Sequence, residues 1–164
     1  MKDCSILMLG VGNILWADEG FGVRVIETLH QQYLFPDTVQ LMDGGTQGLY
    51  LLPYVQAARQ LLLFDAIDYD LPPGSLKVIY NDEVPAFLNA NKMSPHQMGF
   101  QEVLASARLL EQYPEDIVLI GVQPQLLDNY GGDLTDAVKQ QIQPAIHIAL
   151  EHLSRWGIQV QPRT

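Results

Sequence analysis

The stretch SILMLGVGN (residues 5–13) decides the fold of this chain. Its first six residues lack the polar–apolar alternation of a half-exposed strand, so residues 5–10 are predicted to form a strand buried on both faces. A glycine turn at residues 10–13 then leads into residues 20–33, where apolar side chains recur at helical spacing. A buried strand followed by a glycine turn and a helix is typical of the start of a parallel α/β sheet.

The alternation of strands and helices continues to the end of the sequence. Further strands are predicted at residues 38–42, 60–64, 76–80 and 117–122, and further helices at residues 46–58, 94–112 and 135–156. The predicted fold is therefore α/β with three layers, in which helices cover both faces of a mainly parallel, twisted five-stranded sheet.

Smaller features refine this prediction. The alternating strand at residues 76–80 is typical of a sheet edge, and the polar residues 81–93 are predicted to form a loop. Pro53 is expected to shorten or kink the second helix, and Pro144 is expected to bend the long last helix.

The composition is that of a compact globular protein. The chain has 164 residues, of which 48% are hydrophobic and 17% charged, and neither a repeat nor a linker divides it, so residues 1–164 are expected to form a single domain. Nineteen acidic and nine basic residues give a net charge of −10, which argues against nucleic acid as a partner. No apolar run is long enough for membrane insertion. The single cysteine, Cys4, and a start unlike a signal peptide predict a cytoplasmic protein.

Three successive predicted strands deliver carboxylates to one edge of the sheet. Asp18 and Glu19 follow the first strand, Asp43 follows the second and Asp65 follows the third. Taken singly, each acid has a structural explanation, such as a helix cap for Asp18 or a turn for Asp43. Because ligands of parallel sheets bind at the carboxyl ends of the strands, the convergence of these acids favours a functional site.

A histidine joins this set. The segment SPHQ (94–97) has the pattern of a helix start, with a capping box and a proline in the first turn. There the helix dipole disfavours the imidazolium form of His96 and leaves a neutral ring that can bind metal. Glu19, Asp65 and His96 together suit a borderline divalent cation such as zinc or nickel.

Two alternatives remain open at this point. One is a self-contained metallohydrolase that binds its own zinc at Glu19, Asp65 and His96. The other is a nucleotide-binding module that uses the turn at residues 10–13, although the third glycine of the dinucleotide fingerprint is replaced by Leu15. Nucleophilic catalysis by serine has no support, because no GxSxG motif is present.

Five segments together resemble the nickel–iron hydrogenase maturation endopeptidases. In chain order they are GVGNILWADEGFGVRV (10–25), DGGTQGLYLL (43–52), LLFDAIDYDLPPG (62–74), KMSPHQMGFQEVL (92–104) and IGVQPQLLDNYGGDLT (120–135). The resemblance spans nearly the whole chain. Two of its parts, LWADEGFGVRV and DGGTQG, are most similar to the branch that serves membrane-bound uptake hydrogenases.

The resemblance implies an endopeptidase that removes a short C-terminal peptide from the precursor of a hydrogenase large subunit after nickel insertion. It implies metal contacts at Glu19, Asp65 and His96, and it matches the acid of the family's DGGT segment to Asp43. The catalytic candidates are then Asp43, Glu19 and Asp65, in an aspartic-type or a metal-assisted mechanism. Nickel would arrive with the precursor rather than be held by the free enzyme.

The sequence also predicts where the protein binds the precursor. The loops at residues 81–93 and 128–133 are both expected to reach the edge that carries the acids. They are therefore the predicted contact surface for the large-subunit precursor.

Overall fold

The structure is a computed structural model, and it describes residues 5–12, 17–45, 48–90, 95–125 and 133–164. For residues 89, 90 and 95–99 the description covers the backbone and not the side chains. The predicted helix cap at Ser94 and most of the predicted loop at residues 128–133 lie outside these ranges.

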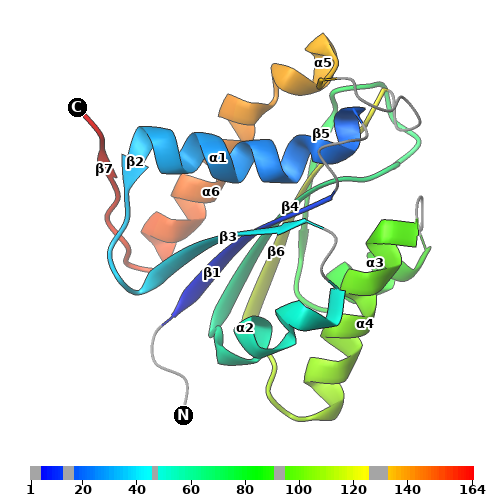
Figure 1. Cartoon of the computed structure of the whole chain (residues 1–164), viewed down its shortest axis with the longest axis vertical. Coiled ribbons are helices and arrows are strands. Elements are labelled where there is room, and N and C mark those ends of the chain that lie inside the picture. Colours follow the sequence, from blue (N-terminus) through cyan, green and yellow to red (C-terminus); the bar gives the residue numbers. More distant parts are fainter. Residues whose placement is uncertain (1–4, 13–16, 46–47, 91–94, 126–132) are drawn as a thin grey trace.

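A five-stranded sheet forms the centre of the molecule, with the strand order β3-β1-β4-β6-β5 (Figure 1). Its strands are β1 (Ile6–Val11), β3 (Val39–Gly45), β4 (Gln60–Ala66), β5 (Leu76–Tyr80) and β6 (Asp116–Val122). The pairs β1–β3, β1–β4 and β4–β6 are parallel, whereas β5 runs antiparallel to β6. The predicted mainly parallel five-stranded sheet, with residues 76–80 at one edge, is confirmed.

Helices cover both faces of this sheet (Figure 1). One face carries α1 (Phe21–Gln32), α5 (Asp136–Lys139) and α6 (Ile142–Arg155), and the other carries α2 (Leu52–Ala57), α3 (Glu83–Ala90) and α4 (Pro95–Leu109). Short 3-10 helices, η1 (Ala17–Gly20) and η2 (Gly48–Leu51), precede α1 and α2. A small antiparallel pair joins β2 (Tyr33–Leu34) to β7 (Gln161–Pro162).

The central strands feed two separate apolar cores. Every residue of β1 is buried, because neighbouring strands and helices enclose it on all sides. Along β4, Leu62 and Phe64 pack into the core beneath α1 and α6, while Leu61 and Leu63 pack into the core beneath α2, α3 and α4. Because side chains alternate between the two faces, a polar residue at a strand end lies on the same face as the apolar residue two positions before it.

Three expectations about helices were wrong. The helix expected at residues 46–58 is replaced by η2 and a short α2, although the expected shortening at Pro53 is confirmed, since Pro53 lies in the first turn of α2, where no backbone donor is lost. The helix expected at residues 135–156 is two helices, and Pro144 lies in the first turn of α6 instead of bending a continuous helix. Within the predicted loop at residues 81–93, α3 forms because Val84 and Leu88 are buried one turn apart.

Candidate functional site

Two buried carboxylates flank the glycine turn that follows β1. Glu19 lies in η1 and is 3% exposed, and Asp65 lies near the end of β4 and is 4% exposed. A Cβ built on Gly12 would collide with the carbonyl oxygen of Glu19 and would lie 3.6 Å from Oδ1 of Asp65. Gly12 also has a φ of +124°, so only glycine allows this close approach. The structure therefore brings the backbone of Glu19 and the side chain of Asp65 together around Gly12.

Burial of two acids in one place needs a physical reason. A buried carboxylate loses its hydration and is rarely found unless it is paired, hydrogen-bonded or bound to a cation. Asp65 meets part of this need locally, because the backbone N–H of Ala66 donates to its Oδ1 at 2.8 Å. Both carboxylates lie in a region of low dielectric constant, where charges interact more strongly than in water.

Asp43 is placed differently from the other two catalytic candidates. It lies on β3 and is exposed. Asp43 is on the same face of the strand as Val39 and Leu41, which pack into the core beneath α1 and α6. Asp65 is on the same face of β4 as Leu63, which packs into the other core, so Asp43 and Asp65 belong to opposite faces of the sheet. This arrangement gives no support to a pair of aspartates that share one proton, because such a pair must be in contact.

Asp18 has a structural role that differs from the predicted helix cap. Gly20 is the N-cap of α1, and no side chain caps that helix. The Asp18 side chain is 0% exposed and accepts hydrogen bonds from the backbone N–H groups of Gln125 (2.8 Å) and Thr135 (2.7 Å). These hydrogen bonds connect η1, which contains Glu19, to Gln125 and Thr135.

His96 is the second residue of α4, close to where the sequence predicted it. Its side chain lies outside the description. The helix itself covers the sheet face to which Asp65 belongs, beside η2, α2 and α3. Among the side chains that the structure describes, no three His, Cys, Asp or Glu residues gather closely enough to hold a metal ion.

The segment after β4 adds a polar network that the sequence did not suggest. The side chain of Gln123 accepts hydrogen bonds from the backbone N–H groups of Tyr69 (2.6 Å) and Leu71 (3.3 Å), and it donates one to Oδ1 of Asp68 (3.0 Å). The hydrogen bond from Gln123 holds the pKa of Asp68 below its usual value, with a further contribution from the backbone N–H of Asp70. Nothing in the run DAIDYDLPPG distinguishes Tyr69, so no sequence signal could have singled it out.

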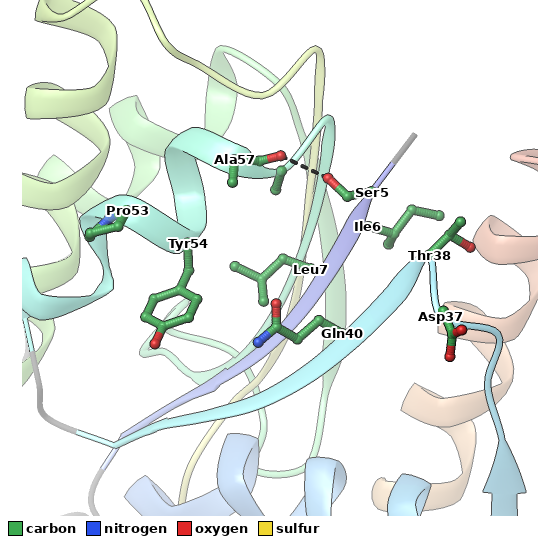
Figure 2. A pocket seen from close by; sticks show the side chains of 10 residues that line it. Ser5, Ile6, Leu7, Asp37, Thr38, Gln40, Pro53, Tyr54 and Ala57 are labelled. Carbon is green, nitrogen blue, oxygen red and sulfur yellow. Dashed lines mark hydrogen bonds between the residues drawn. The ribbon is translucent and has the colours of Figure 1, made fainter. Parts of the chain in front are cut away.

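A cavity of about 460 Å³ lies away from these carboxylates (Figure 2). It opens where β1 and β3 begin, and α2 closes its other side; its polar lining comes from Ser5, Asp37, Thr38, Gln40 and Tyr54. The hydroxyl of Ser5 donates to the carbonyl of Ala57 at 2.7 Å across one end. Because the cavity lies at the amino ends of the strands, it is separate from the site around Gly12.

Comparison with known proteins gives a consistent result. The model of the HycI hydrogenase maturation protease family matches residues 23–152. The hydrogenase expression/formation protein HupD of Bradyrhizobium diazoefficiens is 55% identical over 163 residues, which cover 99% of this chain and 85% of the relative. HoxM of Cupriavidus necator is 57% identical over 159 residues, which cover 97% of this chain and 79% of the relative.

A solved structure agrees with the sequence comparisons. The hydrogenase maturating endopeptidase HybD from Escherichia coli superposes with a TM-score of 0.92 at 41% identity, covering 97% of this chain and 98% of HybD. None of the described helices combines the length and the apolar character needed to cross a lipid bilayer.

Proposed function

The chain belongs to the hydrogenase maturation protease family, and we propose that it is the endopeptidase that removes a short C-terminal peptide from the nickel-loaded precursor of a nickel–iron hydrogenase large subunit. The observation that carries this proposal is that Glu19 and Asp65 are both buried beside Gly12, in a chain 41% identical to a known hydrogenase maturating endopeptidase. Because the proposed substrate already carries nickel, the site is proposed to recognise that metal.

We propose that Glu19, Asp65 and His96 contact the nickel of the precursor. Two carboxylates and one imidazole are suitable ligands for a borderline divalent cation, and three ligands leave positions for the groups that the precursor supplies. Nickel is then part of the substrate, so a precursor without nickel lacks the group that these residues bind. The position of α4 over the Asp65 face of the sheet supports the inclusion of His96.

The catalytic candidates are Asp43, Glu19 and Asp65. In a metal-assisted mechanism the nickel would polarise the scissile carbonyl or activate a water, and a carboxylate would accept the proton of that water. In an aspartic-type mechanism, Asp43 would act as the general base, and nickel would take no part in the chemical step. The exposure of Asp43 supports a role in contact with the bound precursor, because the peptide can reach its carboxylate directly.

The two alternatives have less support. A nucleotide-binding turn needs room and backbone donors at residues 10–13, but the backbone of Glu19 fills the space beside Gly12. A self-contained zinc hydrolase would contain stoichiometric zinc after purification, whereas the proposed enzyme would not. The relatives are named as hydrogenase expression/formation proteins or as a hydrogenase maturating endopeptidase, and these names favour neither alternative.

The test uses purified large-subunit precursor prepared with and without nickel. The enzyme should release the C-terminal peptide, detected by mass spectrometry, from the nickel-loaded form only. Equal cleavage of both forms would refute nickel recognition, and cleavage of neither would refute the proposed function. The compartment of this processing is proposed to be the cytoplasm.

A pair of histidine variants provides the matched control. His96→Ala should abolish processing with an unchanged thermal unfolding midpoint. His147→Ala, which removes an exposed histidine on α6, should leave processing intact. Normal processing by His96→Ala would exclude His96 from the site.

A further inference from the structure

Asp65 is the first member of a row of three residues that crosses the sheet. It pairs with Gly121 on β6, and Gly121 pairs with Lys77 on β5. Leu63 and Leu119, two residues before Asp65 and Gly121, pack into the core beneath α2, α3 and α4. The row therefore lies on the face that α4 covers, and its middle position carries no side chain.

The ring of Tyr69 occupies the space above that middle position. A Cβ built on Gly121 would collide with the Tyr69 hydroxyl and would lie 2.8 Å from Cζ of the ring. Any residue other than glycine at position 121 would therefore displace Tyr69. The hydroxyl lies beside the strand position that pairs with Asp65.

The Tyr69 ring is held from several directions. Its backbone N–H donates to Oε1 of Gln123 at 2.6 Å. Its ring packs against Phe87, with 4.7 Å between centroids, and the ammonium of Lys77 lies 5.5 Å from its centroid. These contacts fix the position of the hydroxyl without involving the hydroxyl itself.

The hydroxyl is buried, yet it has no hydrogen-bond partner among the described residues. A buried hydroxyl without a partner destabilises a folded protein, so this hydroxyl is available to a partner that the described residues do not supply. Burial, and to a smaller extent the negative charge of Asp65, raises the pKa of Tyr69 well above its usual value. A phenol with its ordinary pKa of about 10 already keeps its proton at neutral pH, so the hydroxyl is available as a donor.

We propose that Tyr69 is a positioning residue whose hydroxyl donates a hydrogen bond to the Asp65 carboxylate when that carboxylate engages the nickel of the precursor. This inference rests on the proposed function of Asp65. Carboxylates that bind metals are usually oriented by further hydrogen bonds, and the loss of one such bond typically lowers affinity or activity by about 10–100-fold. The backbone N–H of Ala66 already holds Oδ1, and Tyr69 supplies a second donor on the same face of the sheet.

The test compares two variants that each lose one hydroxyl. Tyr69→Phe should lower kcat for the nickel-loaded precursor at least about tenfold, change KM less than about twofold, and leave the unfolding midpoint unchanged or higher. Tyr80→Phe removes a hydroxyl bound to Nε2 of His152 at 3.1 Å on the opposite face, so it should keep kcat and lower the unfolding midpoint.

The outcomes separate this inference from the proposed function. A wild-type kcat for Tyr69→Phe, or a lower midpoint without a change in kcat, overturns the role of Tyr69. Asp65→Asn tests the premise: if Asp65→Asn processes normally, the proposed function of Asp65 fails as well. If Asp65→Asn is impaired while Tyr69→Phe is normal, only the present inference is wrong.

Discussion

The carboxylate of Asp18 accepts hydrogen bonds from both the backbone N–H (2.7 Å) and the hydroxyl (2.9 and 3.0 Å) of Thr135, 117 residues further along the chain. This interaction joins η1 to the start of α5. Since Glu19 follows Asp18 directly, the same contact also holds one wall of the candidate site in place. Asp18 is thus an acid at the site edge whose function is structural.

Replacing Asp18 by asparagine should lower stability. In Asp18→Asn, an amide NH₂ group would face backbone donors, so at least one buried donor loses its acceptor; we expect the free energy of unfolding to fall by about 1–3 kcal/mol. Urea denaturation measures this change. The control is the exposed Asp37→Asn, which should change stability by less than about 0.5 kcal/mol. Equal stability of both variants would contradict the structural role.

Replacing Gly12 by alanine should damage both stability and processing. In Gly12→Ala, the added methyl group would meet the Glu19 backbone at a φ of +124°, so we expect a loss of at least about 2 kcal/mol and severely impaired processing. Gly48→Ala is the matched control: its φ is +57°, but nothing lies within 4 Å of the added Cβ. It should cost only about 1 kcal/mol and leave processing normal. Similar losses in the two variants would mean that the contact with Glu19 is unimportant.

Asp43 should affect activity without affecting stability. Its side chain is exposed, so Asp43→Asn should change the free energy of unfolding by less than about 0.5 kcal/mol. If Asp43 acts as the general base, the same variant should slow release of the C-terminal peptide by about 100-fold or more. Single-turnover cleavage assays followed by mass spectrometry measure this rate. An unchanged rate would remove Asp43 from the catalytic candidates.

Asp68 should make stability depend on pH in the acidic range. Its folded-state pKa is lowered from 3.8, mainly by the hydrogen bond from Gln123, so its stabilising contribution is present above pH 3.8 and is lost as the pH falls through the folded-state pKa. Asp68→Asn lacks this contribution, so its stability should approach that of wild type as the pH falls below about 4. Urea denaturation between pH 7 and pH 2 measures the difference, with Asp70→Asn as the control. A constant difference across this range would refute the assignment.

The central strands were predictable because their burial is uniform. Residues 60–64 and 117–122 are almost entirely apolar, as a strand enclosed on both faces must be, and both occur in the structure as parts of β4 and β6. The helix boundaries were less predictable, and α3 was predicted to be part of a loop although Val84, Phe87 and Leu88 recur at helical spacing. A helix this short is stable only when its apolar face packs against the core.

The candidate site divides in the same way. Parallel strands end at a common edge, so the sequence was sufficient to expect Glu19 and Asp65 near each other. It did not reveal that Asp18 accepts hydrogen bonds from Thr135, because these two residues are 117 positions apart in the sequence. Nor did it show that Asp43 and Asp65 project from opposite faces, because the face depends on the register of each strand.

The sequence by itself determined the class of fold, the family resemblance and the edge at which the acids converge, because all three follow from local patterns of apolar, glycine and acidic residues. Only the tertiary structure decided what each polar group contacts. It buried Asp18 in a structural interaction, placed Glu19 and Asp65 against Gly12, and positioned Tyr69 over Gly121. These relationships arise from packing between segments far apart in the chain, and that packing is decided only when the sheet and both helical layers have assembled.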